Sequence, residues 1–214
     1  MYTQLKQFCT DRNIDLIVVS KTRPKEAILD LYDLGQRDFG ENRVQELSQK
    51  YNDLPKDIHW HMIGHLQSNK VKYIAPFVHM IHSGASLSLL KEINKRAKQN
   101  DRRIDVLLQL KIAQEGTKSG WDESELMESI ENNHFTSLNN LNIRGVMGMA
   151  TFTDDTTIIR SEFSSLKSIF DTLKSTHFES SSHFDTISMG MSGDYKIAAE
   201  EGSTMVRVGS LLFQ

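Results

Sequence analysis

The stretch Leu16-Ile17-Val18-Val19-Ser20-Lys21-Thr22 decides how we interpret the whole chain. Its apolar, largely β-branched residues predict a β-strand that ends on a lysine. Successive side chains of a strand alternate between two faces, so Ile17, Val19 and Lys21 share one face. If that face points inward, the Lys21 ammonium needs a partner, deprotonation or a covalent bond such as a Schiff base, because a buried ammonium is costly. The alternative is that the strand has already emerged and Lys21 lies in solvent.

Length and composition limit the kind of protein. With 214 residues the chain can bury one substantial core, near the lower end of what an eight-fold βα barrel needs. A net charge of -3, from 25 basic and 28 acidic residues, offers no footprint for nucleic acid or anionic membrane, so we expect a small-molecule partner. A single cysteine, Cys9, excludes an intramolecular disulfide and suits a reducing cytoplasm. The polar N-terminus and short apolar runs predict no targeting segment and no membrane span.

Eight strand signals alternate with helix signals, after a short amphipathic helix predicted over residues 1–12. The expected strands are 16–22, 37–42, 58–64, 77–82, 104–110, 143–149, 184–189 and 204–208. This alternation predicts an α/β protein with a parallel sheet closed into a TIM-type (β/α)8 barrel. Because no linker or repeat interrupts the alternation, we expect residues 1–214 to form a single domain.

The carboxyl ends of the strands carry function in such barrels, so their residues are the candidates for a site. After the seventh strand, a glycine-containing turn with Ser192 as helix cap is typical of phosphate binding, although an ordinary capped turn needs the same residues. The eighth strand places Arg207 on the inward alternation and ends in Gly209 and Ser210, a second anion nest. Strand eight adjoins strand one in a closed barrel, so both nests lie beside Lys21. A lysine for an aldehyde, nests for a phosphate and an arginine for a ring nitrogen together indicate pyridoxal 5'-phosphate (PLP).

Four longer segments resemble the pyridoxal phosphate homeostasis protein family, namely Val19–Thr22, Phe39–Glu46, Trp60–Lys70 and Ser188–Ser192. Its remaining motifs are similar to Ile81-His82-Ser83, to Glu115 with Lys118 and Gly120, and to Val206–Ser210. The likeness covers nearly the whole chain. It implies a single-domain barrel similar to the N-terminal domain of alanine racemase, PLP held on a lysine, and a role in vitamin B6 balance without an established enzymatic reaction.

Carried over by position, the resemblance makes Lys21 the Schiff-base lysine and Arg207 the partner of the pyridine nitrogen. It assigns the phosphate to Ser192, Gly193, Gly209 and Ser210, and the lining of the cofactor to Asn42, Ser83 and Met147. The chain departs from the family pattern at Gly84-Ala85, Lys111 and Ala199. Relatives continue beyond the position of Gln214, so the resemblance implies a final segment that is absent here.

Two functions stay open. Arginine keeps its proton, so a guanidinium at the ring nitrogen leaves the ring neutral and weakens it as an electron sink. That favours a non-enzymatic carrier and buffer in intracellular PLP homeostasis, a cytoplasmic monomer whose partners are PLP, amino acids or PLP-dependent client enzymes. The alternative is a weak amino-acid racemase. Racemisation needs acid and base groups on opposite faces of the substrate carbon, and no tyrosine stands at a strand end to oppose Lys21.

A third class follows from His59 and His61, a His-x-His pair with His65 close by, because metal-dependent hydrolase barrels use such pairs. Strands six and eight end on Met147 and Arg207 instead of metal ligands. We therefore expect no metal and interpret the histidines as hydrogen-bonded groups within the barrel mouth. We interpret two acidic residues, Glu41 and Glu46, as helix-start and surface charges.

Overall fold

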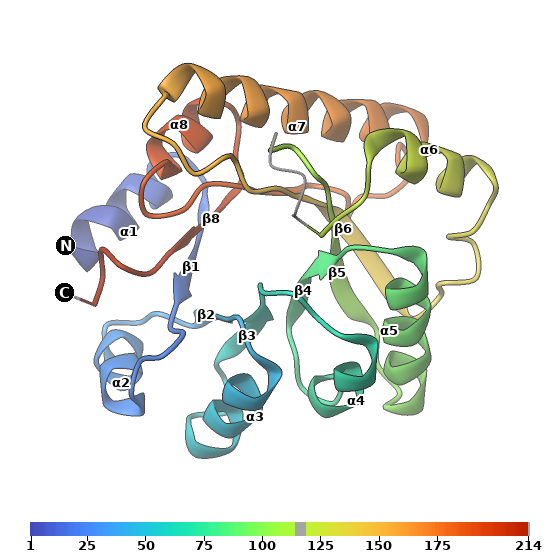
Figure 1. Ribbon diagram of the computed structural model, residues 1–214. Coiled ribbons are helices and arrows are strands. Elements are labelled where there is room, and N and C mark those ends of the chain that lie inside the picture. The colour runs from blue at the N-terminus through green and yellow to red at the C-terminus, as the bar shows by residue number, and fades with distance from the viewer. Residues whose placement is uncertain (114–118, 214) are drawn as a thin grey trace.

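The fold is a closed eight-stranded barrel surrounded by helices (Figure 1). The computed structural model describes residues 1–113 and 119–213. All neighbouring strands are parallel and follow one another in chain order around the barrel. Pairing of Asp15 with Met205 through Val18 with Val208 joins the first strand to the last. The (β/α)8 barrel predicted from the alternation of strands and helices is confirmed.

The elements have the following bounds. The strands are β1 (Asp15–Val19), β2 (Asp38–Glu41), β3 (His59–Met62), β4 (Met80–Gly84), β5 (Ile104–Gln109), β6 (Leu141–Met147), β7 (Thr186–Ser188) and β8 (Met205–Val208). The helices are α1 (Tyr2–Thr10), α2 (Lys25–Asp33), α3 (Val44–Asp53), η1 (Ser68–Lys70), α4 (Val71–Ile74), α5 (Leu87–Gln99), α6 (Glu123–Glu131), α7 (Thr156–Thr176) and α8 (Tyr195–Glu200).

Apolar side chains form two layers that the strand alternation separates. Inside the barrel lie mostly aliphatic and thioether side chains, namely Ile17, Met80, Leu107, Met147 and Met205. The larger layer lies between the strands and the helices, and it includes Leu16 and Val18 from β1. Ile17 and its two neighbours therefore point to opposite faces, as predicted for this strand. The barrel interior is a packed core and not a pore.

β1 ends at Val19, three residues before the predicted end at Thr22. Ser20 N–H still donates to Gly40 O (3.1 Å), but Thr22 adopts a positive φ of 62°. A left-handed residue cannot continue a strand, so the chain leaves the sheet and α2 begins at Lys25. The apolar and β-branched pattern that predicted the strand contains no signal for this turn.

The part of the chain that the structure describes contains no helix long and apolar enough to cross a lipid bilayer. Two residues of one family-like motif, Glu115 and Lys118, lie outside the described residues.

Candidate functional site

A cavity of about 420 Å³ opens at the carboxyl ends of β1, β6, β7 and β8. Its size is typical of a small-molecule site. It is lined by the turn after β1, residues 150–154 after β6, residues 191–194 after β7, and the end of β8. Six of the nine residues expected at the site line this one cavity, namely Lys21, Ser192, Gly193, Arg207, Gly209 and Ser210.

Lys21 lies two residues beyond β1, with an exposed side chain that lines the cavity. Of the two alternatives left open for Lys21, the structure favours the second, in which the strand has already ended and the ammonium is exposed to solvent. Val19 also lines the cavity, so Lys21 still follows the inward alternation of β1. Within residues 1–113 and 119–213 the structure gives the Lys21 ammonium no hydrogen bond and no ion pair. The amine is thus accessible and uncommitted at the edge of the cavity.

Buried charges hold the turn that presents Lys21. Lys50, from α3, donates to Glu41 Oε1 and to Ser20 O, both at 2.7 Å. The Ser20 hydroxyl donates to the same Glu41 oxygen at 2.6 Å. On the other side of Lys21, the Thr22 N–H donates to Glu46 Oε1 (2.6 Å), which also accepts from Lys50 Nζ at 2.7 Å. Both residues that flank Lys21 are therefore fixed by one network, which we call the Lys50 clamp.

Glu41 is fully buried, so its interpretation as a surface charge is wrong. Burial raises the pKa of Glu41, and the hydrogen bonds from Lys50 and Ser20 oppose that rise. Glu46 is partly exposed, and its contact with Thr22 goes beyond a helix-start charge. Its i,i+4 spacing to Lys50 on α3 is the one sequence signal for the clamp.

Loop backbone forms a polar wall of the cavity. The N–H groups of Ser192, Gly193 and Ser210 have no acceptor among the described residues. A Cβ on Gly193 would meet no atom within 4 Å, whereas one on Gly209 would lie 2.8 Å from Val19 O. Gly193 thus leaves open space beside unpaired donors, and Gly209 lets the end of β8 approach β1. Donors of this kind suit a phosphate.

Ser192 does not cap a helix, contrary to expectation. Asp194 is the N-cap residue of α8, and its Oδ1 accepts from the Met191 N–H at 2.5 Å. The Ser192 hydroxyl instead accepts from the Gly209 N–H at 3.3 Å. This bond joins the loop after β7 to the end of β8. Because α8 has only six residues, the unpaired loop N–H groups and not the helix end are the donors that this wall of the cavity offers.

Arg207 is a buried cation that lines the cavity, as expected from its inward position in β8. Its Nη1 donates to Ser188 Oγ at 2.6 Å and its Nη2 to Gly148 O at 3.1 Å. Burial lowers the pKa of Arg207 to about 10, and the charge of Asp194 opposes this shift. The guanidinium therefore remains protonated at neutral pH and presents only hydrogen-bond donors.

The other three expected residues, Asn42, Ser83 and Met147, do not line the cavity. Asn42 is partly exposed after β2, Ser83 is buried with an unpartnered hydroxyl, and Met147 lies in the barrel interior. Their contact with a ligand stays a prediction from the family resemblance. The sequence reasoning missed Phe152, a residue that is 95% exposed and lines the cavity. It lies in a loop without a strand-end motif, so no sequence pattern marks it.

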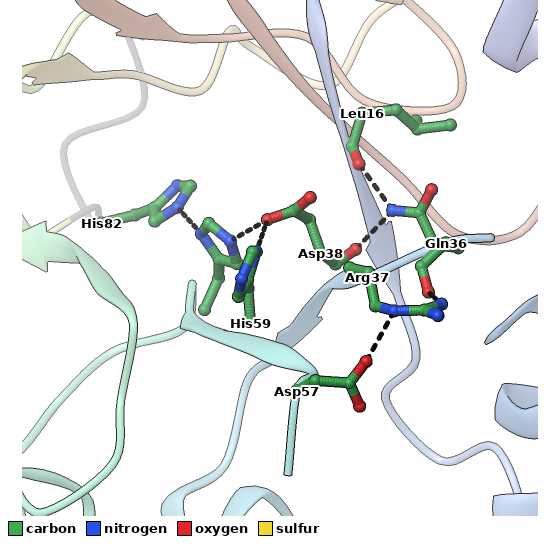
Figure 2. A network of polar contacts seen from close by, with 8 residues as sticks. Leu16, Gln36, Arg37, Asp38, Asp57, His59 and His82 are labelled. Atoms are coloured by element: carbon green, nitrogen blue, oxygen red, sulfur yellow. Dashed lines mark hydrogen bonds and ion pairs between the residues drawn. The ribbon is translucent and has the colours of Figure 1, made fainter. Parts of the chain in front are cut away.

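The histidines of β3 lie at the opposite end of the barrel from the cavity. His59 Nδ1 and His61 Nε2 both contact Asp38 Oδ1, at 3.1 and 3.2 Å (Figure 2). Donor atoms of Asp38, His61 and His79 lie within 4.8 Å of one another, but both ring nitrogens of His61 are engaged in hydrogen bonds. His65 is exposed and follows β3 at its other end. The interpretation of His59 and His61 as hydrogen-bonded is confirmed, but they lie at the amino ends of the strands.

The chain is similar to known proteins over nearly its full length. Residues 2–214 match the family described as alanine racemase, N-terminal domain. The pyridoxal phosphate homeostasis protein of Aquifex aeolicus is 40% identical over 199 residues, which are 92% of this chain and 85% of that protein. The protein of that name from Vibrio alginolyticus is 36% identical over 217 residues, covering 99% and 91% of the two chains.

Solved structures are also similar to this chain over most of its length. PipY of Synechococcus elongatus, determined with PLP bound, has a TM-score of 0.84 and 33% identity over 94% of this chain and 93% of its own. Alanine racemase of Bartonella henselae, with a TM-score of 0.72 and 14% identity, matches 97% of this chain and 56% of its own, and shares the fold.

Fold and cavity together define a (β/α)8 barrel that carries an accessible lysine, a buried arginine and a group of unpaired backbone N–H donors at one mouth. Within this class, the chain belongs to the alanine racemase N-terminal domain family and, inside it, to the pyridoxal phosphate homeostasis proteins. The family expected from the sequence motifs is confirmed.

Proposed function

We propose that this protein binds PLP in the cavity through Lys21 and acts as a carrier and buffer in PLP homeostasis. The observation that carries the proposal is the meeting of three kinds of group around one cavity. They are an uncommitted amine, three unpaired backbone N–H groups and a buried guanidinium. The names of the relatives and the PLP in PipY support the same ligand. We place this activity in the cytoplasm and in one domain spanning residues 1–214.

Each group has a separate task. When bound, PLP supplies an aldehyde that condenses reversibly with a primary amine. Lys21 offers that amine, and the Lys50 clamp fixes the backbone on both sides of it. The N–H groups of Ser192, Gly193 and Ser210 donate to the phosphate and form the anion cradle. Arg207 donates to the ring nitrogen and keeps its own proton, so the ring stays unprotonated and is a poor electron sink.

The composition of the cavity supports a carrier over a racemase. Apart from Lys21, the titratable residues that line it in the described chain are Arg23, Asp154, Asp194 and Arg207. Racemisation needs a second acid–base group across the substrate carbon. Of the two carboxylates in the lining, Asp194 is already engaged with the Met191 N–H and Asp154 is exposed to solvent. The exposure of Lys21 also allows an amino acid or a client enzyme to take over the cofactor. We further propose that the protein acts as a monomer.

Solvent exchange at amino acids separates the two functions. We expect the PLP-loaded protein to leave the α-proton of alanine in place in deuterated water, and to restore activity to a PLP-dependent enzyme stripped of its cofactor. Proton NMR follows the first property and an activity assay the second. If the α-proton exchanges, and exchange disappears in Lys21→Ala, the racemase replaces the carrier.

Gly193 offers a test of the anion cradle. We expect Gly193→Ala to fold normally, because the new methyl group meets no atom within 4 Å, but to bind PLP about tenfold more weakly, since the methyl occupies the space for the phosphate. Titration with PLP and the Tm measure the two effects. Gly209→Ala should instead lower the Tm, because its Cβ would lie 2.8 Å from Val19 O. Unchanged PLP affinity in Gly193→Ala would place the phosphate elsewhere.

A further inference from the structure

A chain of hydrogen bonds crosses the barrel interior from the cavity to the opposite mouth. It begins where Arg207 Nη1 donates to Ser188 Oγ (2.6 Å), which lies 3.0 Å from His82 Nδ1. His82 Nε2 lies 3.0 Å from His61 Nδ1, and His61 Nε2 lies 3.2 Å from Asp38 Oδ1. Figure 2 shows the far end of this series, with Asp38, His59 and His82 among the residues joined by dashed lines.

Apolar side chains surround this chain. Residues that are register partners on neighbouring strands point to the same face of the sheet. The partner of His61 is Met80, those of Ser188 are Met147 and Met205, and that of Arg207 is Ile17. His61, Ser188 and Arg207 therefore point inward, among the side chains of the barrel interior. His61, His82 and Ser188 are buried. Polar groups enclosed in this way depend on one another for hydrogen bonds, because leaving one unpaired is costly.

The two ends of the chain fix its direction. A guanidinium only donates, so Ser188 Oγ accepts from Arg207. The Ser188 hydroxyl proton then points to its other neighbour, so Ser188 donates to His82 Nδ1. A carboxylate only accepts, so His61 Nε2 carries a proton and donates to Asp38. The remaining bond then runs from His82 Nε2–H to His61 Nδ1. With both rings neutral, every donor faces an acceptor.

The ionisation of these groups agrees with that direction. Burial, together with the neighbouring charge of Arg207, holds the pKa of His82 well below its ordinary value, so this ring is neutral. Burial works against ionisation of Asp38, but the hydrogen bonds from His61 and His59 hold its pKa below the ordinary value. The chain thus joins a buried cation to a carboxylate at the other mouth of the barrel. Gln36 holds the backbone of Asp38 by donating to its carbonyl oxygen at 2.7 Å.

We propose that Ser188, His82, His61 and Asp38 are positioning residues that hold the Arg207 guanidinium in place through this one-way chain. The proposal rests on the proposed function in one respect, namely that Arg207 faces the ring nitrogen of PLP. None of the four lines the cavity, so their effect on a bound ligand passes through Arg207. Breaking the chain lets the guanidinium turn away, which weakens PLP binding and shifts the absorption band of the bound cofactor.

The direction of the chain is measurable without any ligand. Nitrogen-15 NMR of the histidine rings in the cofactor-free protein should find both His82 and His61 neutral and protonated on Nε2. The exposed His65 serves as the reference ring. An Nδ1-protonated tautomer or a charged ring at either buried position would overturn the proposed chain. This result does not depend on whether the protein binds PLP.

Two variants then test the effect on the site. Ser188→Ala removes the link between Arg207 and His82, and we expect about tenfold weaker PLP binding, a shifted absorption band and loss of the His82 tautomer preference. Ser188→Thr keeps the hydroxyl and should retain all three properties. Asp38→Asn removes the negative charge at the far, partly exposed end, and its amide can turn either a donor or an acceptor toward His61. The preference of His61 for a proton on Nε2 should therefore weaken, and the band should shift in the same direction.

The outcomes separate the two proposals. If the natural chain binds PLP but Ser188→Ala and Asp38→Asn leave both affinity and absorption unchanged, the four residues do not position Arg207. If the natural protein binds no PLP, the proposed function fails. The histidine tautomers still show whether the series of hydrogen bonds from Arg207 to Asp38 exists.

Discussion

Lys21→Ala is expected to abolish covalent retention of PLP. Lys21 is the one lysine of the described chain that lines the cavity, and its amine is free of other contacts. Alanine removes the amine but leaves the clamp that holds Ser20 and Thr22, so the fold and the phosphate cradle should persist. After borohydride reduction, the mass of the natural chain should rise by one cofactor, and that of the variant should not change.

Lys25→Ala is the matched control for this experiment. Lys25 is exposed at the start of α2, only four positions away, and it does not line the cavity. We expect this variant to retain PLP like the natural chain. A reduced adduct that survives in Lys21→Ala would assign the covalent bond to another amine and refute the role of Lys21.

Lys50→Met is expected to lower the free energy of unfolding by about 3–5 kcal/mol, the usual result of removing one partner of a buried ion pair. Glu41 would keep only the Ser20 hydroxyl as a partner inside the protein. Its pKa is already raised by burial and would rise further without the Lys50 ammonium. A raised carboxyl pKa adds stability at low pH that is lost as the pH rises, so the destabilisation should shrink in acid. Urea unfolding at several pH values measures both effects.

Two further variants make this result specific. Lys167→Met breaks an exposed i,i+4 pair with Asp171 and should cost less than about 1 kcal/mol. The double variant Lys50→Met/Glu41→Leu also removes the buried carboxylate that Lys50→Met leaves without its cation. It should recover most of the lost free energy of unfolding. If Lys50→Met is no more destabilising than Lys167→Met, the clamp does not hold the turn around Lys21 as the distances indicate.

Several features could be derived from the sequence because they follow from local patterns. Periodicity and turn residues predicted the eight units, and the alternation of β1 correctly separated Ile17 from its neighbours. Closure of the barrel then placed Lys21 beside Ser192 and Gly209, since β1 and β8 are paired. In a closed barrel, consecutive strands are neighbours in space and the first strand pairs with the last. These long-range contacts could therefore be predicted from the order of the strands alone.

Other features depended on side-chain geometry that residue spacing does not encode. The left-handed φ of Thr22 moved Lys21 out of the strand and into solvent. The burial of Glu41 depends on Lys50 reaching it from the next helix, a contact that only tertiary packing creates. In the same way, the histidine pair was visible in the sequence, but its link through His82 and Ser188 to Arg207 joins four strands.

The most direct test of the account is to find the amine that holds PLP in the natural chain. The loaded protein is reduced with borohydride and digested, and the modified peptide is sequenced by mass spectrometry. We predict a single modified residue, Lys21. Modification of a different lysine, or no modified peptide after loading with excess PLP, would contradict the assignment of this cavity as the cofactor site.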